Sequence, residues 1–262
     1  NVELQPISGA QIDDWMSRIV EQSPDFKSQI HHVDNRWRKR MQGRASCFYS
    51  VEAEALRARE LAMIESERAL AALRLFAPGN LHPTARSLCV PYGRQHLVTD
   101  VTISIEHGKH IDSEEKIPTR GGPPFWQLTD ETFKFCWDSG LSDLSDLLST
   151  EPPSGLEVDL LKGLLIYSRA SLSADVTEKL LHIFVMLESL LLKDENEPIA
   201  ASIAERVAFV VGRSADERIA IARCLKEAYS LRSRFVHHGA SVDDLDTVRS
   251  LMHHAFAVYI GI

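Results

Sequence analysis

Apolar residues recur at helical spacing through the C-terminal part of the chain, and the breaks between runs are well marked. Asp175 and Asp216 fall in first turns, Pro198 opens one run, and Gly212 and Gly239 each follow the end of another. The pattern predicts helices over residues 156–171, 174–193, 198–212, 215–238 and 243–260. The connections between them are short, so neighbouring helices should pack antiparallel as a bundle.

The first 150 residues have a more varied pattern. Strong helix formers dominate 9–76 and predict helical structure there, ended by Pro78 and Gly79. A run rich in Val, Ile and Thr, including the alternating "VTISI", predicts a β-hairpin at about 86–106 around "YGRQ". The polar, Gly- and Pro-punctuated stretch 107–124 is expected to be an exposed loop, and short helices are expected at 128–137 and 141–149.

The stretch "STEPPSG", residues 149–155, is the expected domain boundary. It separates an N-terminal region, 1–150, from a helical bundle, 156–262. The predicted fold class is mainly α, with one small hairpin in the N-terminal region.

Composition narrows the class of protein without naming an activity. The chain has 262 residues, 44% of them hydrophobic, which suffices for a substantial core. Its four cysteines form no CxxC pair, so the thiols are expected to be free and the protein cytoplasmic. No apolar run is long enough to predict a membrane span. A net charge of −8 argues against a constitutive binder of long nucleic acid, but leaves room for a local RNA site.

Chemistry-bearing side chains gather in "KEAYSLRSRFVHHGAS", residues 226–241. Arg232, Arg234, His237 and His238 fall in the last two turns of a predicted helix that stops at Gly239. One interpretation is a C-terminal cap, because cations suit the negative end of a helix dipole and Gly suits the position after it. The other interpretation is a catalytic site.

Three segments in order resemble the HEPN domain, specifically its Apea-like branch: "LLHIFVMLESLL", "SIAERVAFVVG" and "LKEAYSLRSRFVHHG". The resemblance covers residues 156–260 and implies a helical bundle that dimerises. It also implies a metal-independent endoribonuclease of the kind found among bacterial toxins and anti-phage effectors. By this resemblance Arg232 and His237 would be catalytic, with Ser233 the polar residue after the arginine and Tyr229 the aromatic residue ahead of it. His238 fits the spacing equally well, so the choice of histidine stays open.

These residue types suit RNA cleavage without a metal. A histidine titrates near neutral pH and can move protons, whereas an arginine keeps its charge and matches phosphate oxygens. The RNA supplies the 2′-OH nucleophile, so DNA should resist and no cofactor or metal is expected. Residues five apart on an ideal helix differ by about 140° in direction. Arg232 and His237 therefore need either a distorted helix end or a second copy of the chain across a two-fold axis.

Glu188 lies on a helix that is apolar nearly all round. Burying a lone carboxylate is costly, so Glu188 is expected to pair with Arg232 or Arg206 and, in the first case, to orient the guanidinium. The remaining alternative is that Glu188 points to solvent at a helix seam.

The N-terminal stretch "NRWRKRMQGR" offers a second set of cations. This stretch could contact RNA phosphate and stack a base, or it could be a solvated helix face. Its candidate RNA-binding residues are Arg36, Trp37, Arg38, Lys39 and Arg40. Arg234, near the C-terminus, is a further candidate for RNA contact. Adjacent histidines point to different sides of a helix, so the pairs His31–His32 and His253–His254 predict no metal site.

Three functions remain open at this point. The chain could be a dimeric HEPN ribonuclease, a catalytically silent HEPN module for dimerisation or binding of a ligand or RNA, or a helical adaptor. The expected partners are a second copy of the chain and RNA, with no membrane and no DNA.

Overall fold

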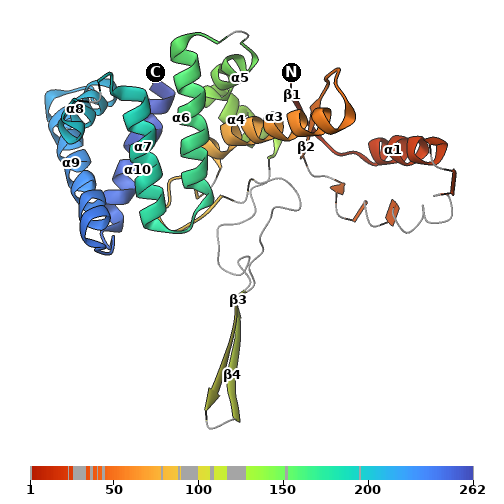
Figure 1. Ribbon diagram of the computed structural model, residues 1–262, viewed down its shortest axis with the longest axis horizontal. Coiled ribbons are helices and arrows are strands. Elements are labelled where there is room, and N and C mark those ends of the chain that lie inside the picture. Colours follow the sequence, from red (N-terminus) through yellow and green to blue (C-terminus); the bar gives the residue numbers. More distant parts are fainter. Residues whose placement is uncertain are drawn as a thin grey trace. The chain divides into compact units, whose positions relative to one another are not determined.

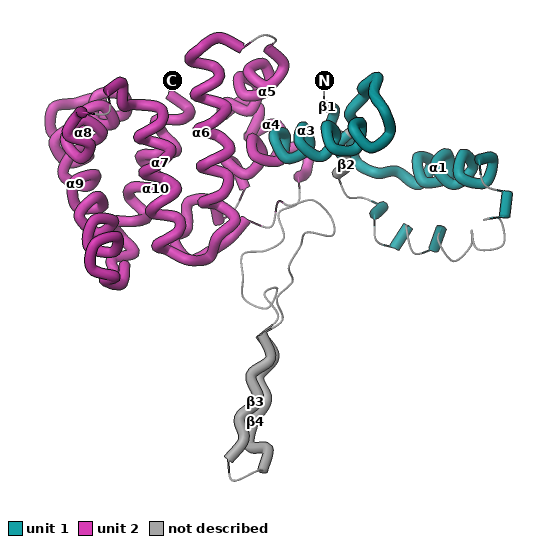
Figure 2. The backbone as a smooth tube through the Cα atoms, in the orientation of Figure 1, with its two compact units in different colours: residues 1–69 teal, residues 70–262 magenta. Residues whose placement is uncertain are grey.

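The computed structural model describes residues 2–22, 24–25, 34–35, 38–39, 41–42, 45–77, 79–87, 89, 100–106, 109–116, 128–150, 153–194 and 196–261. The chain divides into two compact units, residues 1–69 and 70–262 (Figure 2). The described part is mainly α-helical, as the sequence predicts.

The first unit contains a two-stranded sheet and two helical segments. Strand β1, Val2–Pro6, pairs antiparallel with β2, Ala45–Tyr49. Helix α1, Gly9–Gln22, begins with Ser8, whose hydroxyl accepts a hydrogen bond from the Gln11 backbone N–H at 3.2 Å. The buried side chains of Ile7, Ile12 and Met16 form a small core beneath α1.

Helix α3, Ala55–Phe76, contains the division between the two units. Its C-terminal turns enter the core of the second unit, where the run Ala71–Leu75 is buried. The Phe76 ring meets the Phe256 ring edge-on, with centroids 6.1 Å apart.

The bundle of the second unit consists of the five predicted helices, and their predicted bounds are confirmed within about two residues. They are α6, Gly155–Leu172; α7, Val176–Leu191; α8, Ile199–Val211; α9, Ala215–His238; and α10, Leu245–Gly261 (Figure 1). Helix α7 packs against α6, α8, α9 and α10, and α8 packs against α9. The central position of α7 follows from its sequence, which is apolar on most sides.

The two short predicted helices are also confirmed. Helix α4, Asp130–Cys136, passes through a π-helical turn, η2, Trp137–Leu141, into α5, Ser142–Ser149. Leu141 and Leu144 bury their side chains at this corner, and α5 packs on α6. The boundary expected at 149–155 stays a prediction, although residues 70–150 belong to the same compact unit as the bundle.

The predicted hairpin at 86–106 lies only partly within the described residues, so its pairing stays a prediction. The expected loop over 107–124 is wrong in part: strand β3, Asp100–Glu106, pairs with β4, Lys109–Lys116, with Asp100 opposite Lys116 and Glu106 opposite Lys109. A loop was predicted at β4 because "KHIDSEEK" is polar and Ile111 is its only residue of a type that strands favour. The "YGRQ" turn falls outside the described residues.

The continuous helical structure expected over 9–76 is wrong at β2. Residues Ala45–Tyr49 pair with β1 instead, and Phe48 and Tyr49 are residue types that favour strands. Over the described part of the chain, no helix combines the length and the apolar character needed to cross a membrane.

Candidate active site

Helix α9 carries the candidate catalytic side chains and is held firmly at both ends. At its start, the Ser214 hydroxyl accepts from the Glu217 backbone N–H, while the Glu217 carboxylate accepts from the Ser214 N–H, both at 3.2 Å. At its end, Gly239 adopts a left-handed conformation, φ 63°, and its N–H donates to the Phe235 carbonyl at 2.8 Å. The helix is regular through His238, so a distorted helix end does not bring Arg232 and His237 together.

Arg232 meets Glu188 at the seam between α9 and α7, which is one of the two pairings that the sequence predicts. An Arg232 terminal nitrogen lies 3.6 Å from Glu188 Oε1, and each side chain is 23% exposed. The solvent-facing alternative for Glu188 is therefore wrong. The other candidate, Arg206, instead lies 2.6 Å from Glu197 Oε2 and donates to the Leu191 carbonyl.

The Arg232–Glu188 pair is close without being hydrogen bonded. The 3.6 Å between the terminal nitrogen of Arg232 and Glu188 Oε1 exceeds hydrogen-bonding distance. Among the described residues, Glu188 Oε1 and Arg232 Nε are both buried and have no hydrogen-bond partner. Buried polar atoms are hydrogen bonded in the great majority of cases. This seam consequently holds one unused donor and one unused acceptor next to each other.

Tyr229 and Phe184 fix the position of the guanidinium. Arg232 donates to the Tyr229 hydroxyl at 3.3 Å, and its Cζ lies 5.3 Å from the centre of the Tyr229 ring. That ring stands edge-on to Phe184 of α7, with centroids 5.4 Å apart and an interplanar angle of 88°. Phe184 is 1% exposed, so the aromatic pair is anchored in the core of the bundle. The sequence analysis missed Phe184, whose signal was its place one turn before Glu188 on the same helix.

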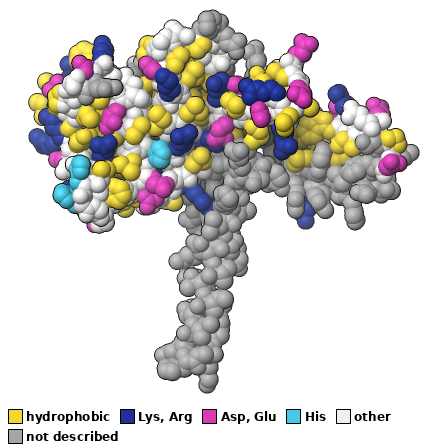
Figure 3. Space-filling model, viewed as in Figure 1, with side chains coloured by type: hydrophobic (Ala, Val, Ile, Leu, Met, Phe, Trp, Pro, Cys, Tyr) yellow, Lys and Arg dark blue, Asp and Glu magenta, His cyan; other side chains and the backbone are white. Residues whose placement is uncertain are grey.

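His237 and His238 lie one turn beyond Arg232 and are exposed. Their rings are 6.4 Å apart between centroids, at 62°. Figure 3 shows histidine side chains reaching the surface of the bundle. In the described part of the chain neither ring has a hydrogen-bond partner, so both are free to meet a substrate.

Ser233 and Arg234 complete the row of candidates on α9. Ser233 is half-buried, and Arg234 is exposed. The pKa of Asp244 is lowered, mainly by hydrogen bonds from Thr247 and to a small extent by the charge of Arg234. Arg234 is therefore near an acidic loop, which reduces its attraction for phosphate.

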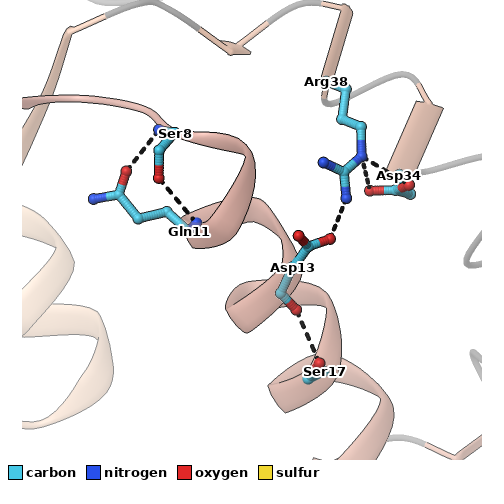
Figure 4. Close-up of polar contacts among 6 residues, drawn as sticks. All are labelled: Ser8, Gln11, Asp13, Ser17, Asp34 and Arg38. Carbon is cyan, nitrogen blue, oxygen red and sulfur yellow. Dashed lines mark hydrogen bonds and ion pairs between the residues drawn. The ribbon is translucent and has the colours of Figure 1, made fainter.

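The N-terminal cationic stretch is described only in part. Arg36, Trp37 and Arg40 fall outside the described residues, and Lys39 is exposed. Arg38 lies between two carboxylates, as Figure 4 shows. Its Nε donates to Asp34 at 3.0 Å and a terminal nitrogen donates to Asp13, which together raise the pKa of Arg38. With both partners in place, the charge of Arg38 is already neutralised.

Metal-ligating side chains do not cluster within the described ranges, where no group of three or more His, Cys, Asp or Glu residues could hold an ion. His31 and His32 fall outside those ranges. His253 and His254 lie on α10, where burial and the neighbouring His253 lower the pKa of His254.

A fully buried cation on α7 was not predicted from the sequence. Lys179 is 0% exposed, and its ammonium donates to the carbonyls of His82, at 2.8 Å, and Ala85. Burial lowers the pKa of Lys179 to about 8. The available signal was its position four residues before Ile183, on the buried face of the helix.

Comparisons of the chain with protein-family models, with curated protein sequences and with solved structures return no match.

Proposed function

We propose that the chain is a metal-independent endoribonuclease of the HEPN type that acts as a homodimer. The observation that carries the proposal is the arrangement at the end of α9. A guanidinium is fixed at the α7–α9 seam by Tyr229 and Glu188, and two exposed histidines lie one turn further on. The resemblance of three ordered sequence segments to the family supports the proposal, because it implies a catalytic Arg and His at Arg232 and His237.

The proposed reaction uses side chains of α9 and a hydroxyl of the substrate. One histidine removes the proton of a ribose 2′-OH, and the 2′ oxygen attacks the adjacent phosphorus. The bond from phosphorus to the 5′ oxygen breaks, and a second histidine returns a proton to that oxygen. The products are a 2′,3′-cyclic phosphate and a 5′-OH. The Arg232 guanidinium offsets the charge that builds up on the phosphoryl oxygens.

A second copy of the chain supplies the second histidine in this proposal. Helix α9 is regular to His238, so Arg232 and His237 of one chain point in directions about 140° apart. A two-fold axis near the end of α9 lets the arginine of one chain face a histidine of the other. Light scattering at micromolar concentration should give the mass of a dimer, and a monomer would contradict this part of the proposal.

The decisive experiment for the activity is incubation of purified protein with tRNA and mRNA in EDTA. Wild type should cleave both or one of them, and His237→Ala should lose about 10²–10⁴-fold in rate while folding normally. His238→Ala is the matched control on the neighbouring residue. If His238 is only the residue before the cap, its loss costs at most about 1–2 kcal/mol of stability and little activity.

One observation favours a second candidate function, a catalytically silent module for dimerisation or binding. Glu188 already lies 3.6 Å from Arg232 and offsets part of its charge. A silent module would still dimerise and would leave RNA intact in the same assay. A role as a bacterial toxin or anti-phage effector belongs to the ribonuclease proposal and not to the silent module.

A further inference from the structure

Helix α4 exposes an unusual amount of aromatic surface. The side chains of Phe133, Phe135 and Trp137 are 37%, 68% and 42% exposed. Phe133 and Trp137 stack on each other, with ring centroids 5.7 Å apart and an interplanar angle of 29°. Large exposed aromatic groups that lie together are typical of interaction surfaces, where they contribute much of the binding free energy.

The stacked pair is held on a rigid support. Cys136, between the two rings in sequence, is 1% exposed and anchors the helix in the core. The π-helical turn after α4 contains Gly140 at φ 116°, and a Cβ there would lie 3.4 Å from Ile260 of α10. Residues other than glycine avoid this backbone conformation, so the turn requires glycine at this position. Rings held in place before binding lose little conformational freedom when a partner arrives.

Acidic side chains lie near the stacked rings in sequence. Asp130 lies one turn before Phe133 on the same side of α4, and Asp138 directly follows Trp137. Five carboxylates are exposed between α4 and α5, namely Asp130, Glu131, Asp138, Asp143 and Asp146. The one cation in that stretch, Lys134, is paired with Asp138 at 2.7 Å. The helix dipoles favour acids in the first turns, but they do not account for Asp138 and Asp146, nor for the exposed rings.

The charge of this surface selects the class of partner. Phosphate groups are repelled by a run of carboxylates, so nucleic acid does not fit here. Arg and Lys side chains can make two kinds of contact with this surface: they pair with carboxylates, and they are attracted to the faces of Trp and Phe rings. Apolar side chains of the same partner can cover the exposed ring edges.

We propose that the surface formed by Phe133, Trp137 and the nearby carboxylates of Asp130 and Asp138 docks a basic amphipathic segment of another protein. Such a segment presents Arg or Lys beside leucine-like or aromatic side chains on one face of a helix. The proposal is independent of the ribonuclease proposal, since none of these residues belongs to α7 or α9.

The test uses the full chain and a fluorescein-labelled peptide of about 18 residues, built from Lys and Leu at helical spacing. Fluorescence anisotropy should show saturable binding, and Trp137→Ala should weaken it about tenfold or more. Asp130→Asn combined with Asp138→Asn should weaken binding and reduce its dependence on salt. Phe209→Ala is the matched control, because Phe209 is 72% exposed but lies on α8, which is not part of the proposed surface.

Four results overturn the proposal: no binding at any reachable concentration, equal binding of a peptide with Glu in place of Lys, equal losses for Trp137→Ala and Phe209→Ala, or self-association of the chain that disappears in Trp137→Ala. In the last case the occupant is a second copy. Circular dichroism of each variant separates loss of binding from loss of folding. RNA cleavage by Trp137→Ala should match wild type.

Discussion

The two ends of helix α7 carry opposite charges in contrasting surroundings. Near its start, Lys179 is fully buried and donates to two backbone carbonyls. Near its end, Glu188 is 23% exposed and lies close to Arg232 without a hydrogen bond. The first group is satisfied within the fold, whereas the second retains unused hydrogen-bonding capacity, and the exposed histidines follow Arg232 further along α9. We propose that Lys179 serves stability, whereas the Glu188–Arg232 pair serves the proposed cleavage.

The largest effect should come from Arg232→Lys. Lysine keeps the positive charge but loses the planar fork that holds two phosphoryl oxygens, so the cleavage rate should fall about 100-fold or more. The melting temperature should stay close to that of wild type, since the pair with Glu188 can still form. Single-turnover cleavage and thermal unfolding of the same preparation measure the two effects. A rate equal to that of wild type would mean that Arg232 has a structural role.

Lys179→Met should produce the opposite combination. The substitution leaves the carbonyls of His82 and Ala85 without their buried donor, at a cost of about 1–3 kcal/mol in the free energy of unfolding. Cleavage by the folded fraction should be unchanged. Urea denaturation gives the first quantity and active-site titration of the folded protein the second. A loss of cleavage without a loss of stability would mean that Lys179 serves cleavage rather than stability.

The pH dependence of stability should also single out Lys179. Burial lowers its pKa from 10.5 to about 8, so between these values the unfolded chain holds a proton that the folded chain has lost. The free energy of unfolding should therefore gain a contribution that rises from about pH 8 to about pH 10. Below pH 8 both states are protonated and the contribution is flat. Denaturation of wild type and Lys179→Met across this range isolates the contribution, because other groups titrate equally in both; identical slopes would contradict the assignment.

The smallest effect should come from the glycine that ends α9. Gly239 has φ 63°, and a Cβ there would meet nothing within 4 Å, so Gly239→Ala should cost about 1–2 kcal/mol through backbone conformation alone. Gly155→Ala is the matched control, since a Cβ at Gly155 also meets nothing within 4 Å and its φ is ordinary. Urea denaturation should separate the two variants; equal costs would mean that the left-handed cap contributes nothing measurable.

The bundle could be predicted from the sequence because its determinants are local. Apolar spacing, first-turn acids and end glycines lie within each helix, and the observed bounds follow them. The pairing of Glu188 with Arg232 could be predicted because a carboxylate in an apolar helix needs a cation. Strand β4 could not be predicted, because its stability comes from pairing with β3 and its own residues are polar. The partners of Lys179 could not be predicted either, because they are backbone carbonyls, which every residue has.

The central claim is that the end of α9 cleaves RNA without a metal, using the 2′-OH of the substrate. The most direct measurement compares one end-labelled RNA with the same RNA methylated at the 2′ oxygen of the cleaved position, both in EDTA. Wild type should cut the first strand, leave a 2′,3′-cyclic phosphate and spare the second, and His237→Ala should cut neither at a comparable rate. An intact first strand, cleavage of the methylated strand, or cleavage that needs a restored divalent metal would contradict the account.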